Sequence, residues 1–377
     1  MGALIPYLGL YFQALGFSAL QIGLLMGGLI GTKVIAPNLW GWLADASHKL
    51  VIWIQLSSFF SLLILAGLGI LDSFWALLGI ILLFGFFWHA TLPLFEAYTF
   101  KTLENHMKAA YGRVRLWGSI GFIVAVLWAG SMIAHWGIES LPLMLIGVLG
   151  LGFVSTLWIR EKSVHPSLEA HQAFHEEIAV LSVWQILHQP WVIGLLLVSF
   201  LIQFSHGAYY SFYSIYLTEA GYSQSLIAWL WALGVIAEIG IFYYMTVLLH
   251  HWSAWQLLKV ALFLTVMRWL MIAEAVESLT ILLFAQLLHA ASYGLFHAGA
   301  IYLIDQHFAH RTQARGQAIY ASISHGLGGG LGMLMAGIWW HDYGGEVTYL
   351  INAAVVAFAL LMLYLVPNNI GKGLKRG

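Results

Sequence analysis

The chain of 377 residues contains no cysteine, and only 8% of its residues are charged. The first absence excludes disulfides, thiol chemistry and cysteine-based metal sites. The charged fraction is far below the roughly 25% of a soluble domain, so the chain has too little charge to cover a water-facing surface. Because the formal net charge is only −1, no bulk electric field would recruit nucleic acid.

Apolar residues take the place of the missing charge: 61% of the chain is hydrophobic and its mean hydropathy is +0.85. This composition predicts an all-α membrane protein that crosses a lipid bilayer many times. About 20 apolar residues are needed for each crossing, and we expect about twelve transmembrane helices. The predicted spans are 1–15, 19–42, 50–71, 75–99, 114–135, 140–159, 189–216, 224–248, 256–274, 279–304, 316–340 and 346–366.

One long polar stretch, 160–188, separates six of these spans from the other six. It is the predicted cytoplasmic linker between two helix bundles, and part of it can form a helix at the membrane surface. The predicted domains are therefore the bundles 1–159 and 189–366, the linker between them, and a cytoplasmic tail at 367–377.

An internal repeat supports this division into halves, and a repeat constrains the architecture more than any single segment. A shift of 205 positions brings Lys33 onto Glu238, so the halves carry opposite charges at one repeat position. Because the seventh span begins near 190, the same shift predicts that about half of the first helix is missing through truncation or a misassigned start. A naturally short, tilted helix is the alternative. The other matched pairs are Gly2 and Gly207, Ala3 and Ala208, Tyr11 and Tyr216, Gly16 and Gly221, Ser18 and Ser223, and Ile22 and Ile227.

Lysine and arginine predict the orientation, because they are enriched in cytoplasmic loops. Thirteen of the fifteen lie at even-to-odd connections or in the C-terminal tail; the exceptions are Lys33 and Arg268. The opposite connections carry acidic residues and no lysine or arginine. We therefore expect the C-terminus to be cytoplasmic.

Several stretches resemble a known family. The segment GWLADASHKL, Gly41 to Leu50, resembles the loop signature between the second and third helices of the major facilitator superfamily, although Ala46 and His48 replace its usual basic residue and glycine. More narrowly, the chain resembles the 3-phenylpropionic acid permease group, relatives of lactose permease and the nucleoside:proton symporters. The stretches that carry this resemblance are YGRVRLWGSIGF (111–122), the opening stretch through its repeat at Glu238, the pair Arg268–Trp269, and 287–298.

The resemblance implies two six-helix bundles that move by alternating access. It also implies a proton-coupled symporter that imports a small organic solute, with 3-phenylpropionate as the leading substrate and a sugar or nucleoside as the alternative. The proton gradient would be the driving force, no cofactor is expected, and we expect a monomer in a bacterial inner membrane.

Four charged residues inside apolar spans are candidates for the transport chemistry, because each costs at least about 2.5–3.5 kcal/mol in mid-membrane. Glu238 is the predicted proton carrier, since a carboxyl group in a low-dielectric site can load and release a proton as its surroundings alternate. Arg268 can tune Glu238, bind a substrate carboxylate or form a permanent salt bridge with Glu238. Lys33 can bind an anion or form a lock between the halves, and Glu96 can couple protons or form a gate salt bridge.

Histidines and aromatic residues complete the predicted site. Histidine titrates near neutral pH, so His297 is a candidate for proton coupling and His89 and His206 for substrate binding. His89 and His297 lie in matching W-H-A and F-H-A motifs, 208 positions apart. Packing alone is the alternative for each of them. Aromatic side chains that can stack on a substrate ring, or simply pack, are Tyr7, Tyr11, Trp88, Tyr209 and Tyr213.

The predicted cytoplasmic connections contain charged residues that can form a latch for one transport state. These are Asp45, Lys49, Arg113 and Arg115, and the alternative is that they only set the topology.

Two other functions are weaker hypotheses. Histidine pairs such as His171 with His175 suggest a membrane enzyme with iron, a metal that imidazole suits, but the pairs share no spacing and such an enzyme needs no charge-swapped repeat. A sensor built on a transporter fold lacks an appended signalling domain.

Overall fold

The computed structural model describes residues 1–103, 107–161, 183–308 and 313–366, and these residues form helices and no strand. The first group contains α1 (Ile5–Ala14), α2 (Ala19–Gly31), α3 (Ala36–Ser47), α4 (Leu50–Leu65), α5 (Phe74–Leu103), α6 (Met107–Trp136) and α7 (Leu141–Thr156). Short 3₁₀ turns η1 (Thr32–Val34), η2 (Ala66–Gly69) and η4 (Ile138–Ser140) extend or connect them.

The second group begins with a short helix inside the predicted linker 160–188, most of which lies outside the described residues. Two of its segments are π-helical, η5 (Ala290–Leu295) and η6 (Ser322–Gly328). Its α-helices are α9 (Val183–Leu187), α10 (Pro190–Ser205), α11 (Gly207–Glu219), α12 (Gln224–His251), α13 (Ala254–Glu274), α14 (Leu279–Leu287), α15 (Phe296–His307), α16 (Gln313–Ala321) and α17 (Gly329–Leu365).

Ten stretches of the described chain are long and apolar enough to cross a membrane, which confirms the predicted all-α membrane fold. The last stretch, Arg315–Leu365, covers the predicted eleventh and twelfth spans, and it breaks at Gly344, whose φ is 80°. The predicted first span is not among these stretches, because α1 has only ten residues and is too short to cross a membrane. At 1.5 Å per residue α1 is about 15 Å long, half of the bilayer's hydrocarbon core.

The internal repeat is visible in local geometry. Gly16 and Gly221 have φ values of 85° and 87°, a backbone conformation that glycine adopts without steric cost. Two residues later Ser18 and Ser223 each accept a hydrogen bond from a backbone N–H in the first turn of α2 and α12. The same turn therefore joins the first two helices of each half.

A pair of tyrosines extends the repeat to tertiary contacts. The hydroxyl of Tyr11 donates a hydrogen bond to the carbonyl of Leu68 at 3.1 Å, and that of Tyr216 donates to the carbonyl of Ala273 at 3.2 Å. Both the donor and the acceptor of the second bond lie 205 positions after those of the first. Within each half, the first and third spans are thus joined by an equivalent hydrogen bond.

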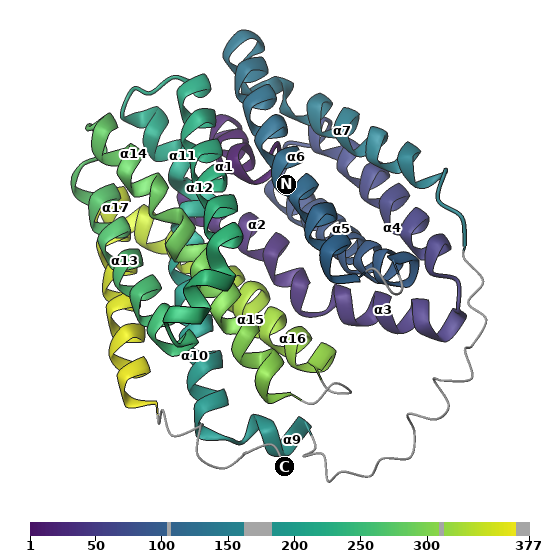
Figure 1. Cartoon of the computed structure of the whole chain (residues 1–377). Helices are drawn as coiled ribbons and strands as arrows, with labels where there is room; N and C mark the ends of the chain where they lie inside the picture. The colour runs from purple at the N-terminus through teal and green to yellow at the C-terminus, as the bar shows by residue number, and fades with distance from the viewer. Residues whose placement is uncertain (104–106, 162–182, 309–312, 367–377) are drawn as a thin grey trace, which may run out of the picture.

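The most extensive helix contacts between the halves are those of α1 with α11, α2 with α17, and α6 with α12. Figure 1 shows the purple-to-blue helices α3 to α7 on one side and the green-to-yellow helices on the other, with α1 and α2 at the boundary. The α2–α17 contact is so close that a Cβ on Gly337 would lie 2.8 Å from the Cα of Gly23. Small residues allow such an approach in lipid.

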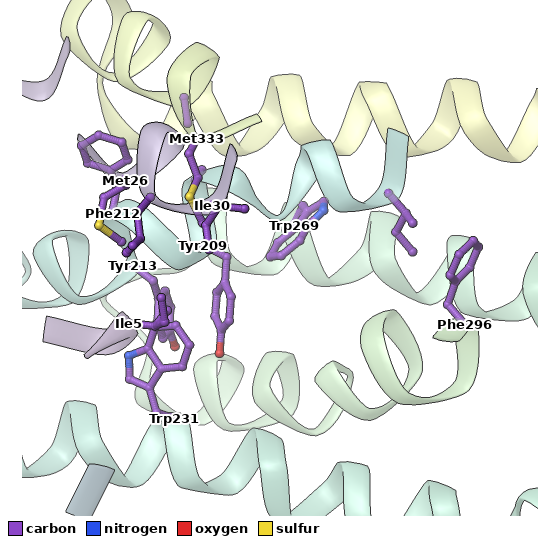
Figure 2. Close-up of a cluster of buried hydrophobic side chains, with 14 of the residues drawn as sticks. Ile5, Met26, Ile30, Tyr209, Phe212, Tyr213, Trp231, Trp269, Phe296 and Met333 are labelled. Atoms are coloured by element: carbon purple, nitrogen blue, oxygen red, sulfur yellow. The ribbon is translucent and has the colours of Figure 1, made fainter. Parts of the chain in front are cut away.

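The larger of two clusters of buried hydrophobic residues spans this boundary and draws side chains from both halves. Figure 2 shows Met26 and Ile30 near Phe212 and Tyr213, with Trp231 beside Ile5. Most of these side chains are buried, and several of them also form apolar walls of the cavity described next.

Candidate functional site

A cavity of about 300 Å³ lies between the two halves. Its walls come from α1, α2, η1 and α6 of the first half and from α10, α11, α12, η5, η6 and α17 of the second. Two of the predicted charged residues, Lys33 and Glu238, line it. Apolar residues such as Ile5, Ile30 and Met333 supply much of the remaining wall.

Lys33 enters the cavity from η1, the short 3₁₀ turn between α2 and α3. Pro37 follows within the first turn of α3, and a proline there interrupts the continuous helix because it cannot donate a backbone hydrogen bond. Within the described residues, the Lys33 ammonium has no hydrogen bond or ion pair. A lysine placed this deep in a membrane protein is costly unless an anion compensates it.

Glu238 projects from the middle of α12 and faces His289, the residue directly before η5. The Glu238 Oε2 and the His289 Nε2 are 3.7 Å apart, and both side chains are largely buried, at 13% and 7% exposure. His289 was not among the predicted site residues, although it also lines the cavity. The two groups form an ion pair when the imidazole is protonated.

A column of rings continues from His289 along η5 and α15. His289 stacks on Tyr293 with ring centroids 5.8 Å apart, and Tyr293 stacks on His297 at 5.9 Å. The Nδ1 of His297 lies 3.2 Å from the hydroxyl of Tyr320. His325, from the second π-helical segment, packs against the same column, and its ring centroid is 5.5 Å from that of His297.

Arg268 is fully buried in α13, behind the cavity wall. Its Nε donates to the carbonyl of Ala285 at 3.1 Å and its Nη1 to the hydroxyl of Ser292 at 3.0 Å. The guanidinium also lies over the rings of Tyr209 and Trp269, at 4.2 and 4.6 Å. Its Nη2 has no hydrogen-bond partner within the described residues. The contacts of Arg268 are therefore with aromatic faces, a carbonyl and a hydroxyl.

Comparison with known proteins identifies the family of this chain. A family model described as the MFS_1-like family matches residues 1–351. The chain belongs to the MFS_1-like family. Its fold and its relatives are those of transporters of the major facilitator type, not of enzymes, and such transporters act on small molecules and generally need no cofactor.

This MFS_1-like protein is similar in sequence to two curated relatives and similar in fold to one solved structure. It is 28% identical, over an alignment of 381 positions, to the probable 3-phenylpropionic acid transporter of Escherichia coli strain K12. This alignment covers 97% of this chain and 94% of that one. It is 25% identical over 248 residues to the multidrug resistance protein MdtG of Klebsiella pneumoniae strain 342, covering 62% and 57%. The crystal structure of the nucleoside transporter NupG matches its fold with a TM-score of 0.82 at 16% identity, covering 97% and 95%.

Several residues predicted to bind substrate lie outside the cavity walls of this MFS_1-like transporter. The hydroxyls of Tyr7 and Tyr11 donate to the carbonyls of Val126 and Leu68. His89 lies 2.8 Å from the Thr32 hydroxyl. These residues connect helices within the first half, and their roles as substrate ligands remain predictions.

The predicted aromatic stretch on α11 is similarly engaged in packing. Tyr209 donates to the Oε1 of Gln286, which in turn donates from its Nε2 to the hydroxyl of Tyr213. His206 is fully buried at the break between α10 and α11, and its Nδ1 lies 2.8 Å from the Ile202 carbonyl. Of this stretch, Tyr210 is the residue that lines the cavity.

The remaining predicted residues with described side chains also lie outside the cavity walls, on α5 and around the turn between α3 and α4. Trp88 stacks on Phe84, and Glu96 is half-buried near the C-terminal end of α5. Asp45 and Lys49 are exposed around the turn between α3 and α4. The side chains of the other two predicted latch residues, Arg113 and Arg115, are outside the described set.

Proposed function

We propose that the chain is a proton-coupled symporter that imports a small aromatic carboxylate, with 3-phenylpropionate as its leading substrate. One observation carries this proposal: a cation from one half and a titratable carboxyl–imidazole pair from the other face the same cavity. A cation suits an anionic solute, and a titratable pair suits a coupling proton.

Substrate recognition begins at Lys33, whose ammonium would bind the carboxylate. The aromatic ring would lie against Tyr210 and Trp231, which line the cavity from the second half. A cavity of about 300 Å³ is at the lower end of typical ligand pockets, which suits a solute of this size. The name of the Escherichia coli relative points to the same substrate class.

Proton coupling would centre on Glu238. Loading a proton would neutralise its carboxylate and weaken its pairing with His289. The column through Tyr293 and His297 would connect this pair with the cytoplasmic end of α15, with water bridging the stacked rings. Arg268 would hold the aromatic cluster beside Glu238 in place, and Glu96 would act nearer the cytoplasmic side.

Alternating access would follow from the two halves, 1–159 and 189–366, rocking about the cavity. The close glycine contacts of α2 and α17 and a hydrogen bond from the Gln13 Nε2 to the Glu219 Oε1 join the halves at one end. The distribution of lysine and arginine supports an arrangement in which that end is the outer one and the C-terminus lies in the cytoplasm, and the location we propose is a bacterial inner membrane. In this conformation, the outer gate would be closed. Asp45, Lys49, Arg113 and Arg115 would contribute to the inner latch of a transporter that works as a monomer.

Uptake of labelled 3-phenylpropionate by cells that express the chain tests the proposal. We expect accumulation above the level of cells with an empty vector, and a proton uncoupler should abolish it. The membrane level of the protein, measured on blots, is the control for expression. Absence of uptake would refute the substrate, and uptake of labelled nucleoside or sugar instead would support the alternatives. Accumulation that persists with the uncoupler would refute proton coupling.

A further inference from the structure

Ser292 lies next to the Glu238–His289 pair and links the backbone of His289 to Arg268. Its hydroxyl accepts a hydrogen bond from the Nη1 of Arg268 at 3.0 Å and donates one to the main-chain carbonyl of His289 at 3.3 Å. A hydroxyl has one hydrogen to donate and can also accept, so both bonds can form at once. The Ser292 side chain is fully buried in η5, and it was not among the predicted site residues.

Arg268 holds the segment around His289 at a second point. Its Nε donates to the carbonyl of Ala285, four residues before His289, whereas Ser292 follows three residues after it. The guanidinium therefore bonds to both flanks of His289, where α14 is followed by η5. Arginine keeps its charge and serine does not titrate. This brace, formed by Arg268 and Ser292, thus stays the same while Glu238 gains and loses a proton.

Close glycine contacts constrain the pair where η5 packs against α12. A Cβ on Gly234 would lie 3.3 Å from the Cβ of His289, and one on Gly294 would lie 3.0 Å from the Cγ of Glu238. Each of the two packed segments thus presents a glycine to the other. The His289 Nε2 and the Glu238 Oε2 are 3.7 Å apart. Since an ion pair needs its two atoms within about 4 Å, a small displacement of His289 would break the pairing.

Other side chains contact the imidazole ring of His289. The rings of Tyr209 and Tyr293 pack against it, with centroids 5.6 and 5.8 Å away. These contacts are with the ring, whereas the brace bonds to the main chain that carries it. Further charged or titratable groups that line the same cavity are Lys33, Tyr210 and His325.

We propose that Ser292 is a positioning residue for proton coupling, which links His289 to Arg268 and so holds the imidazole within reach of Glu238. This inference rests on the proposed function, in which re-forming the Glu238–His289 pair accompanies release of the proton. Without the Ser292 hydroxyl, the Arg268 Nη1 and the His289 carbonyl would both lose a hydrogen bond. Binding and exchange of substrate should then continue, whereas coupling to the proton gradient should weaken.

Proteoliposomes that contain the purified full chain test this inference through two rates for labelled 3-phenylpropionate: proton-driven accumulation, and exchange for unlabelled substrate. Ser292→Ala should lower the ratio of accumulation to exchange by about tenfold or more, the scale of one hydrogen bond to a charged group. Ser292→Thr keeps the hydroxyl and should keep the wild-type ratio. A merely structural defect would lower both rates together and leave their ratio unchanged.

Ser199→Ala is the matched control, and it should leave the ratio as in the wild type. Ser199 is also fully buried in the second half, but its hydroxyl donates to the Leu195 carbonyl of its own helix, α10. Where Ser292→Ala does not fold, Ser292→Cys decides the matter, because a thiol is a weak donor and acceptor. A wild-type ratio in Ser292→Cys would then overturn the inference.

The outcomes separate this inference from the proposed function. If wild-type protein accumulates no 3-phenylpropionate under a proton gradient, both are overturned. If the wild type accumulates it and Ser292→Ala has the same ratio as Ser199→Ala, the inference is overturned and the proposed function stands.

Discussion

Replacing Gly337 by alanine should shift the protein away from the conformation described above. A Cβ at this position would lie 2.7 Å from the Ala19 carbonyl oxygen and 2.8 Å from the Gly23 Cα. Both contacts are with the backbone of α2, so no flexible side chain can move aside. Ordinary van der Waals contact begins at 3.4 Å, and α2 and α17 would therefore have to separate by about 0.7 Å at a close-packed interface.

The size of the shift follows from the cost of overpacking. An added methyl group in a well-packed interface costs about 1–3 kcal/mol. Parting of the outer gate would relieve the clash, so this cost falls on the closed state and changes the ratio of the two conformations by about 5- to 150-fold. Helix propensity also favours alanine over glycine by about 1 kcal/mol, but it acts on both conformations alike. Gly147→Ala in α7 is the matched control, because nothing lies within 4 Å of its added Cβ.

Spin-label distance measurements can read the shift directly, because the chain has no native cysteine. Labels on Trp75→Cys and Tyr343→Cys would report the separation of the halves at the proposed outer end; both native side chains are exposed, at 76% and 61%. Gly337→Ala should increase the population of longer distances in protein without ligand. A distance distribution identical to that of Gly147→Ala would refute the idea that this contact holds the gate closed.

Two further predictions concern single side chains. Lys33→Gln should weaken binding of 3-phenylpropionate by about tenfold or more, because a charge-assisted hydrogen bond contributes about 1.5–3 kcal/mol; calorimetry on the purified protein measures this, and an unchanged affinity would exclude Lys33 as the anion ligand. Tyr11→Phe and Tyr216→Phe should each lower the free energy of unfolding by a similar amount, about 0.5–1.5 kcal/mol, because each hydroxyl makes the equivalent hydrogen bond to a carbonyl. Thermal unfolding in detergent tests this equivalence, and a loss in one variant alone would contradict it.

The fold could be predicted from sequence because its main signals are long and repeated. Apolar segments long enough to span a membrane directly indicate transmembrane helices. Identical residues 205 positions apart indicate the internal repeat. In the structure, residues 205 positions apart form equivalent turns at Gly16 and Gly221 and equivalent tyrosine hydrogen bonds. Element ends were less predictable: α6 begins at Met107, before the predicted 114, because a helix can continue past the apolar segment into polar residues.

The candidate site was predictable where a charge interrupts an apolar helix. Lys33 and Glu238 stand out for that reason, and both line the cavity. Aromatic residues carry no such signal, since a tyrosine can pack against a neighbouring helix as readily as against a ligand, as Tyr209 and Tyr213 do against Trp231 of α12. His289 was missed as the partner of Glu238 because the pairing depends on how α12 packs against η5, and a π-helical turn has no recognisable sequence pattern.

The central claim, that Glu238 carries the coupling proton, is tested most directly by comparing two transport modes of Glu238→Gln in proteoliposomes. Glutamine resembles a permanently protonated glutamate, so the loaded carrier can still shuttle substrate but cannot release a proton and return empty. The account predicts that the variant exchanges labelled 3-phenylpropionate for unlabelled substrate across the membrane at a rate near that of the wild type. It should also fail to accumulate substrate against a gradient when an inward proton gradient is imposed. Proton-driven accumulation equal to that of the wild type would contradict the claim.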